Sequence, residues 1–149
     1  MAVEIEGLKR LTDKFFQLHW NDEAIGREPP LWSEPFSFNG GSAPNYDKQG
    51  LYAFLKHGEI TYIGVGAALG RPPYEGHGIG KRLQSYTKII NGVFTLTDAR
   101  LADAGAIVTI GFEKEHAYLA LALESYLIGR MPTIHNVNRQ GRPATQVAI

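Results

Sequence analysis

The chain has 149 residues, of which 44% are hydrophobic and 20% are charged, and its formal net charge at pH 7 is zero. This size and composition indicate a single soluble globular domain with a hydrophobic core, and the zero net charge gives no sign of a large electrostatic nucleic-acid footprint. The lack of cysteine excludes disulfides, thiolate metal sites and cysteine nucleophiles, and the lack of a membrane-spanning apolar run or a secretory signal pattern leads us to expect a cytoplasmic protein.

Residues 1–49 are predicted to form an N-terminal extension made of one helix and a packed loop. A helix is expected over residues 4–18, because apolar side chains recur there at helical spacing. Residues 19–49 are rich in proline and glycine, which is typical of a loop. This stretch also contains Trp20 and Trp32, so we expect the loop to pack against the rest of the protein. The helical stripe consists of Leu8, Leu11, Phe15 and Leu18.

Residues 50–149 are predicted to form the core module. Runs of β-branched and aromatic residues predict its strands, and longer stretches with helical periodicity predict its helices. A connection rich in glycine and proline, residues 66–78, separates the second strand from the first helix. The expected elements are strands at 50–55, 59–65 and 106–112 and helices at 79–91, near 97–104 and at 114–129.

Two tyrosines ten residues apart occupy the first two predicted strands. Tyr52 ends the run Gly-Leu-Tyr, Tyr62 begins the run Tyr-Ile-Gly, and the turn-like sequence 56–59 lies between them. We therefore expect a β-hairpin with one tyrosine on each strand. Tyrosines in strands are also common as ordinary core residues.

The length of the hairpin loop decides whether the two tyrosines share a face of the sheet. A three-residue loop at 56–58, with Gly58 at positive φ, sets Tyr52 opposite Tyr62 on one face. A two-residue loop would pair Tyr52 with Ile63 and place the tyrosines on opposite faces. The position of the glycine favours the three-residue loop.

Arg82 and Tyr86 lie four positions apart on the predicted helix 79–91, so they are neighbours on one helix face. The arginine therefore borders the apolar stripe of this helix. The simpler interpretation is an arginine whose stem covers the edge of the core while its head group stays in water. The stripe consists of Ile79, Leu83, Tyr86 and Ile90.

Glu124 is the only charged residue between His116 and Arg130, within the predicted helix 114–129. It falls on a stripe with apolar residues, so its carboxylate is expected at the core or its edge. A buried carboxylate is costly unless it has an arginine, a metal ion or a raised pKa. The alternative is that this glutamate marks the solvent face of a very apolar helix. The stripe consists of Ala117, Leu121, Glu124 and Ile128.

Taken in order, these residues resemble the GIY-YIG nuclease superfamily. The run 81–86, Lys-Arg-Leu-Gln-Ser-Tyr, is similar to the run that carries the catalytic arginine in excision-repair members of the family. The segment 123–136 is similar to the family's ending, a glutamate followed by Leu-Ile, proline and asparagine. The resemblance covers about residues 50–140. The chain departs from the family at Val65 and Gly66, where many members carry a lysine, and in a longer connection to the arginine helix.

The resemblance implies an α/β fold of the α+β kind, with a small central, mainly antiparallel three-stranded sheet flanked by helices. It implies an endonuclease that hydrolyses DNA phosphodiesters with one divalent metal ion. Glu124 would be the sole protein ligand of Mg²⁺ or Mn²⁺, since a hard cation that keeps its waters suits a single carboxylate. Arg82 would contact the scissile phosphate, which a planar guanidinium suits well.

The resemblance also assigns the proton chemistry and the support of the site. Tyr52 would be the general base, helped by the positive charge of Arg82 and the metal, and Tyr62 would position it or the water. Tyr86 would accept or relay the proton, and His77 competes for this role because it titrates nearer neutrality. Asn136 would hold the site through hydrogen bonds.

The lengthened connection and the arginine helix offer further DNA contacts, Arg71 and Lys81, and Lys81 could replace the lysine that the second motif lacks. Cleavage of both strands would need a homodimer, because the chain has one candidate site. RNA stays open as a substrate. The alternative function is a nucleic-acid-binding module of the same fold that has lost cleavage.

Overall fold

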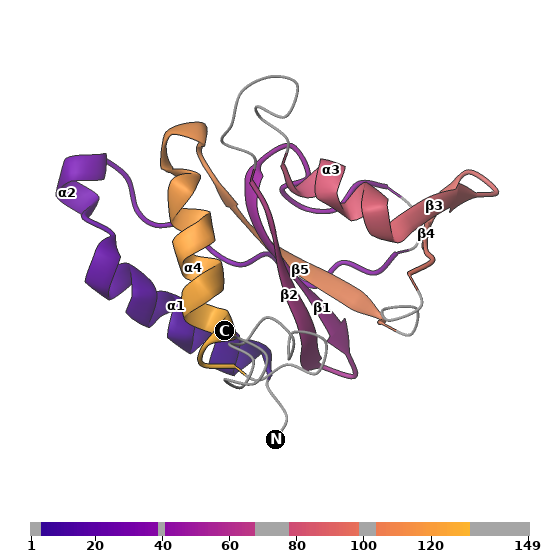
Figure 1. Ribbon diagram of the computed structural model, residues 1–149, viewed down its shortest axis with the longest axis horizontal. Helices are drawn as coiled ribbons and strands as arrows, with labels where there is room; N and C mark the ends of the chain where they lie inside the picture. The colour runs from indigo at the N-terminus through magenta and orange to yellow at the C-terminus, as the bar shows by residue number, and fades with distance from the viewer. Residues whose placement is uncertain (1–3, 39–40, 68–77, 99–103, 132–149) are drawn as a thin grey trace, which may run out of the picture.

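A three-stranded antiparallel sheet lies between two layers of helices in the computed structural model, which describes residues 4–38, 41–67, 78–98 and 104–131 (Figure 1). The mixed α+β fold and the small antiparallel sheet flanked by helices are as predicted. The strands of this sheet are β1 (Gln49–Lys56), β2 (Glu59–Gly66) and β5 (Ala106–Phe112), in the order β2-β1-β5. The other elements are α1 (Ile5–His19), α2 (Asp22–Ile25), α3 (Ile79–Leu83), β3 (Thr87–Ile90), β4 (Val93–Leu96) and α4 (Tyr118–Ile128), with short 3₁₀ turns at Gln84–Tyr86 and Lys114–His116.

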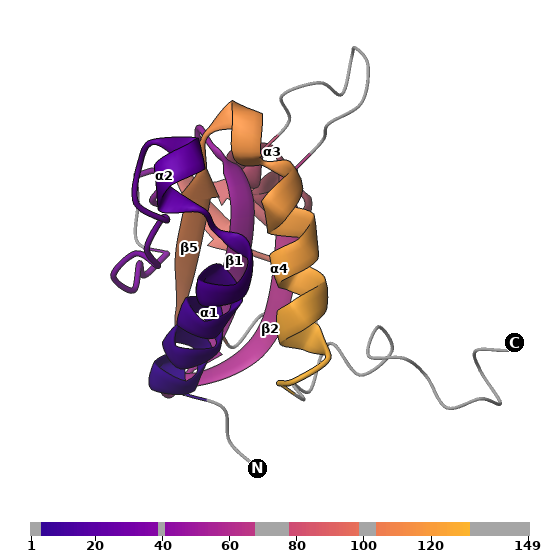
Figure 2. The same cartoon turned by 90° about the vertical axis from the view of Figure 1, so that its left-hand side faces the viewer.

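The two faces of the sheet are covered by different helices (Figure 2). One face, which we call the α4 face, packs against α1 and α4 and carries side chains such as Leu51, Ala53 and Ile110. The other, the α3 face, packs against α3 and carries Tyr52 and Phe54. Because side chains alternate along a strand, successive residues of β1 serve the two faces in turn. The tyrosines and α4 therefore lie in different layers of the molecule.

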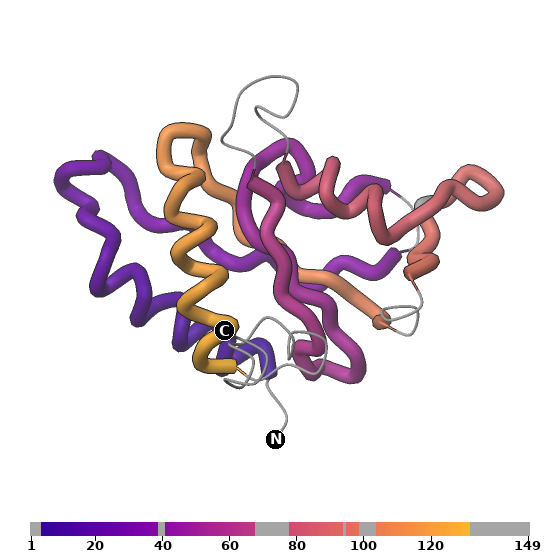
Figure 3. Tube along the Cα trace, viewed as in Figure 1, coloured from indigo at the N-terminus to yellow at the C-terminus, as the bar shows by residue number. Residues whose placement is uncertain are grey.

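The N-terminal residues pack along the sheet, as the sequence predicted for the loop. The indole Nε1 of Trp32 donates to Oγ1 of Thr12 on α1 at 2.8 Å. Phe36 forms a two-way backbone bridge with Ile107, so the loop after α2 runs beside β5 (Figure 3). The predicted helix stripe is right for Leu8 and Phe15 but wrong for Leu18, which is 63% exposed. The buried positions are Leu8, Thr12, Phe15 and Phe16.

A turn at residues 43–48 fixes the beginning of α3. The backbone N–H groups of Ile79 and Gly80 donate to the carbonyl oxygens of Lys48 and Tyr46, each at 2.9 Å. These bonds satisfy amides that a helix leaves without partners in its first turn. The helix that carries Arg82 is therefore held by residues from the N-terminal third of the chain.

The predicted helix 79–91 is correct only in its first half. The α-helix ends at Leu83, and after the 3₁₀ turn the chain forms the hairpin β3–β4 around Asn91 and Gly92, whose φ angles are 52° and 79°. An Asn-Gly pair is a strong signal for a two-residue hairpin turn, and the run Thr-Lys-Ile-Ile before it favours a strand. The predicted helix near 97–104 does not begin at Thr97, whose N–H donates to the carbonyl of Tyr86 at 2.9 Å, and residues 99–103 lie outside the described ranges.

The predicted helix 114–129 is present as a 3₁₀ turn followed by α4. No helix within the described ranges is long and apolar enough to cross a membrane.

Candidate active site

The predicted hairpin is present, but its loop and register differ from the expectation. The loop has two residues, His57 and Gly58, with φ angles of 53° and 80°, and Lys56 pairs with Glu59. This is the backbone of a turn that matches the twist of a hairpin. The predicted three-residue loop and the pairing of Tyr52 with Tyr62 are therefore wrong.

A β-bulge at Thr61 nevertheless brings both tyrosines to the α3 face. The pairing shifts between Leu55 opposite Ile60 and Phe54 opposite Tyr62, so Thr61 has no partner on β1. An extra residue in one strand reverses the alternation of the residues beyond it. The bulge thus gives the common face that the sequence prediction assigned to the loop.

Gly64 stands directly opposite Tyr52 on β2 and makes room for its ring. A Cβ atom built on Gly64 would clash with the hydroxyl and the adjoining ring carbon of Tyr52. The glycine of the Tyr-Ile-Gly run is therefore required by the tyrosine of the Gly-Leu-Tyr run. The two motifs form one packing unit across the strand pair.

We expect Gly64→Ala to destabilise the protein by about 1–3 kcal/mol, the usual cost of overpacking a core, and to displace the Tyr52 hydroxyl. Gly105→Ala is a matched control, because a Cβ on Gly105 meets no atom within 4 Å. Urea unfolding of the two variants measures the difference. Equal stabilities would show that the ring of Tyr52 moves aside at no cost.

Three buried tyrosines form a hydrogen-bonded group on the α3 face. The hydroxyl oxygens of Tyr52 and Tyr86 are 2.9 Å apart, and the hydroxyl of Tyr86 donates to that of Tyr62 at 3.4 Å. Their exposed fractions are 0% for Tyr52, 4% for Tyr86 and 6% for Tyr62. Their rings also contact Phe54, which lies beside Tyr52 on the same face of β1.

Arg82 covers this group from the solvent side. Its guanidinium carbon lies 5.8 Å from the centre of the Tyr86 ring, as their spacing on the predicted helix indicated. A hydrogen bond to Tyr52 is the main reason why the pKa of Arg82 is raised. Arg82 itself is exposed, so a fixed positive charge stands at the surface above buried hydroxyls.

The hydrogen bonds run in one direction. An arginine has only donors, so Tyr52 accepts from Arg82. A phenol has one proton, and Tyr86 gives its own to Tyr62, so Tyr52 donates to Tyr86. The chain thus leads from the arginine through Tyr52 and Tyr86 to the hydroxyl of Tyr62.

Burial raises the pKa of Tyr52 well above its ordinary value of 10.0, and the neighbouring Tyr86 and Tyr62 raise it further. The hydrogen bond from Arg82 lowers this pKa but is the weakest of these influences. The positive charge of Arg82, which the sequence analysis expected to make Tyr52 a better base, is thus outweighed in the free protein. Tyr52 is a neutral phenol at physiological pH.

The raised pKa of Tyr52 predicts a loss of stability in alkali. The folded state keeps this proton above pH 10.0 whereas the unfolded state releases it, so the contribution is constant below that pH and falls above it. The slope approaches about 1.4 kcal/mol per pH unit for one group. Tyr52→Phe should weaken this decline between about pH 9 and pH 11, measured by urea unfolding. Tyr118→Phe is the control, because Tyr118 is 55% exposed and should leave the decline unchanged.

Glu124 is buried, at 7% exposure, so the sequence prediction that it avoids the solvent face of its helix is confirmed. It lies on α4, among residues that pack on the α4 face of the sheet, such as Leu123 and Leu127. Both α3 and α4 contact β2, one of the two edge strands of the sheet. The carboxylate and the tyrosines therefore lie in layers on opposite faces of the sheet, so the structure does not bring Glu124 together with Tyr52, Tyr62 and Arg82.

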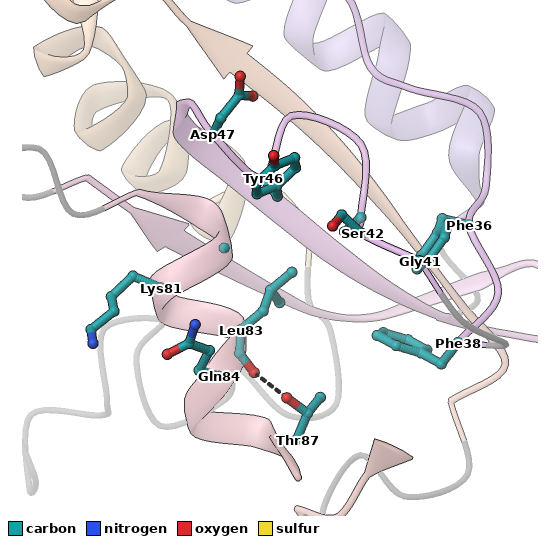
Figure 4. A pocket seen from close by; sticks show the side chains of 12 residues that line it. Phe36, Phe38, Gly41, Ser42, Tyr46, Asp47, Lys81, Leu83, Gln84 and Thr87 are labelled. Atoms are coloured by element: carbon teal, nitrogen blue, oxygen red, sulfur yellow. Dashed lines mark hydrogen bonds between the residues drawn. The ribbon is translucent and has the colours of Figure 1, made fainter. Parts of the chain in front are cut away.

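The remaining predicted residues divide into two groups. Lys81 is exposed and lines a pocket on the side of α3 beside residues 36–38 and 41–47 (Figure 4). Arg71, His77 and Asn136 lie outside the described residues.

Thr109, which no pattern in the sequence singled out, lies beside Tyr52 on the α3 face. It pairs with Tyr52 across β1 and β5 and is fully buried. Its Oγ1 donates to the carbonyl of Pro44 at 2.7 Å and accepts from Nδ2 of Asn45 at 3.0 Å. It thereby ties the turn that holds α3 to the strand behind Tyr52. The only signal in the sequence is one hydroxyl residue in a run of valine and isoleucine.

Comparison of the chain with protein-family models, with curated proteins and with solved structures found no significant match. In the part of the chain that the structure describes, no three histidine, aspartate or glutamate residues gather closely enough to hold a metal ion by themselves.

Proposed function

We propose that this protein is a metal-dependent endonuclease of the GIY-YIG type that hydrolyses DNA phosphodiester bonds. The observation that carries the proposal is the chain of three phenol hydroxyls, Tyr52, Tyr86 and Tyr62, with the exposed Arg82 at one end. These four residues are the ones that the family resemblance assigns to the hydrolytic site. They come from β1, β2, α3 and the 3₁₀ turn after α3, and they meet on one face of the sheet.

Arg82 binds the phosphate in this proposal. Its charge is permanent, its side chain is exposed, and its planar head group can give two parallel hydrogen bonds to phosphate oxygens. Tyr52 already accepts a hydrogen bond from this arginine, which orients the guanidinium before the substrate arrives. A pre-oriented donor that meets the charge developing on the phosphate lowers the barrier more than one that must reorganise.

Tyr52 acts first as a positioning phenol, because its raised pKa opposes deprotonation in the free protein. Its role as general base requires additional positive charge in the complex with DNA and metal. The hydrogen bond to Tyr86, which in turn donates to Tyr62, holds the Tyr52 hydroxyl in place. Cleavage should therefore become faster as the pH rises above neutrality.

Glu124 is the ligand that the resemblance assigns to Mg²⁺ or Mn²⁺, but its buried position in the α4 layer does not give a hydrated cation and a phosphate access to it. Glu124 supplies one carboxylate in a helix without other acidic residues, and its Oε2 is enclosed by protein. A hard cation held by one carboxylate keeps most of its waters and takes further oxygen ligands from the substrate phosphate. When bound, it supplies charge compensation for the phosphate and the leaving oxygen.

Incubation with supercoiled plasmid DNA in Mg²⁺ tests the proposal, with EDTA as the control. We expect nicked product in Mg²⁺ and none in EDTA, and sequencing of the ends reveals specific or non-specific cutting. A linear product at raised protein concentration would indicate cleavage of both strands by a homodimer. Absence of any metal-dependent product from DNA or RNA would contradict the proposal.

The second candidate is a nucleic-acid-binding module of this fold without cleavage. The raised pKa of Tyr52 favours it, because a base that holds its proton tightly is a weak base. Val65 in place of the family's lysine favours it as well. Tight binding to DNA by a protein that gives no metal-dependent product would support this candidate.

A further inference from the structure

A pocket of about 360 Å³ lies between α3 and residues 36–38 and 41–47 (Figure 4). Its size is in the range of pockets that bind small ligands, about 300–1,000 Å³. Two half-buried phenylalanines, Phe36 and Phe38, form an aromatic wall with ring centres 6.0 Å apart and ring planes at 73°, so a flat ligand can stack on one ring at a time. Lys81, Gln84 and Ser42 bring polar groups to its rim.

The pocket shares its inner wall with the tyrosine group. Phe38 stacks on Phe54 of β1, with an angle of 15° between the rings and 6.1 Å between their centres. The same Phe54 ring contacts Tyr62 and Tyr86. The aromatic surface is therefore fixed by the core beneath it, and it is continuous with the group under Arg82.

The helix α3 presents consecutive residues to the two sites. Arg82 lies over Tyr86, and Lys81 lines the pocket. Their Cα atoms are held about 3.8 Å apart by one trans peptide bond. Two neighbouring residues of α3 thus bring one cation to the tyrosine group and a second cation to the pocket.

We propose that this pocket receives a nucleobase of the DNA substrate, taken out of the base stack next to the scissile phosphate. The aromatic wall suits the flat face of a base, and stacking on aromatic side chains accepts any base. The carboxamide of Gln84 offers a donor and an acceptor to the edge of the base. Lys81 binds the adjoining phosphate. This inference rests on the proposed nuclease function.

The test uses duplex DNA that carries a single 2-aminopurine, placed at successive positions around the cleavage site, with protein and EDTA so that the DNA stays intact. Fluorescence of 2-aminopurine rises when it leaves the stack. We expect a rise of several fold at one position adjacent to the cut. Ser42→Trp fills the pocket from an exposed loop position and should abolish this rise. Gln84→Ala should reduce it. Each variant should weaken DNA binding by about 10-fold.

Gln17→Ala is the matched control for Gln84→Ala, because Gln17 is an exposed glutamine on α1, in the other layer. Thermal unfolding confirms that each variant folds. Metal-dependent cleavage by the wild type together with an unchanged fluorescence at every position would overturn the pocket assignment and leave the nuclease standing. So would a full rise in Ser42→Trp.

A different result separates the two proposals in the other direction. If the protein neither binds nor cuts DNA but binds free 2-aminopurine riboside, and Ser42→Trp abolishes that binding, the nuclease and the DNA-base assignment both fall. The pocket would then be a site for a free nucleoside.

Discussion

Arg82→Ala is expected to lower the rate of DNA cleavage by about 1,000-fold, the lower end of what a single arginine contributes to phosphoryl transfer. The guanidinium is the exposed cation above the buried phenols, and Tyr52 orients it through a hydrogen bond. Alanine removes the phosphate contact and leaves the Tyr52 oxygen without this donor. The loss should appear mainly in the rate at saturating DNA, because the contact strengthens as charge develops on the phosphate.

The measurement is the initial rate at which supercoiled plasmid disappears, with DNA affinity determined separately in EDTA. Arg82→Lys should recover part of the rate, since an ammonium keeps the charge but lacks the planar pair of donors. Arg10→Ala removes an exposed arginine from α1 and should cleave like the wild type. A rate in Arg82→Ala within a factor of about ten of the wild type would refute the phosphate-binding role.

Glu124→Gln is the second change with a large expected effect, a loss of cleavage of at least about 1,000-fold at every Mg²⁺ concentration. Glutamine keeps the shape of the buried side chain, so the packing of α4 around Leu123 and Leu127 should persist. It replaces an anionic oxygen by an amide, which is a poor ligand for a hard cation that prefers carboxylates.

One further measurement and one control variant accompany the cleavage rate of Glu124→Gln. Thermal unfolding without metal should be close to that of the wild type, which separates a lost metal ligand from a lost fold. Glu115→Gln, at an exposed position in the turn before α4, should retain full cleavage. If Glu124→Gln folds and still cuts DNA in Mg²⁺ at the wild-type rate, Glu124 is not the metal ligand.

Local spacing predicted the parts of the candidate site that lie within one element. The neighbourhood of Arg82 and Tyr86 follows from four positions along a helical segment, and it holds although the α-helix gives way to a 3₁₀ turn before Tyr86. The burial of Glu124 follows from the apolar helix around it. The layer in which α4 packs is set by how the chain crosses the sheet, which periodicity along α4 does not record.

The prediction of a helix over residues 79–91 was wrong in its second half because two local sequence signals competed there. Apolar residues at helical spacing predicted a helix up to residue 91, while the Asn-Gly turn and the β-branched run before it favoured the hairpin that forms. Ile90, the last residue of the supposed stripe, is 47% exposed on β3.

Other features depend on residues that are distant in the chain and therefore leave little trace in any short window. The bond between Thr109 and the 44–45 turn joins residues separated by 65 positions. The pocket forms only when residues 36–38 and 41–47 pack against α3. Sequence patterns could predict that the loop packs, through its tryptophans, but not which surface it would create.

The bulge at Thr61 shows that the number of residues between the two tyrosines decides whether they share a face of the sheet. With a two-residue turn and regular pairing, the residue numbers of two partners across this hairpin differ by an odd number. Tyr52 and Tyr62 are ten positions apart, an even number. They can therefore share one face only if one irregularity interrupts the regular pairing. A three-residue turn would serve the same end as the bulge. Related chains could therefore lose the residue at position 61 and keep Tyr62 opposite Phe54, whereas a further single insertion beside it would turn Tyr62 to the α4 face. At this point of the fold, evolution is constrained in the number of residues more strongly than in their identity.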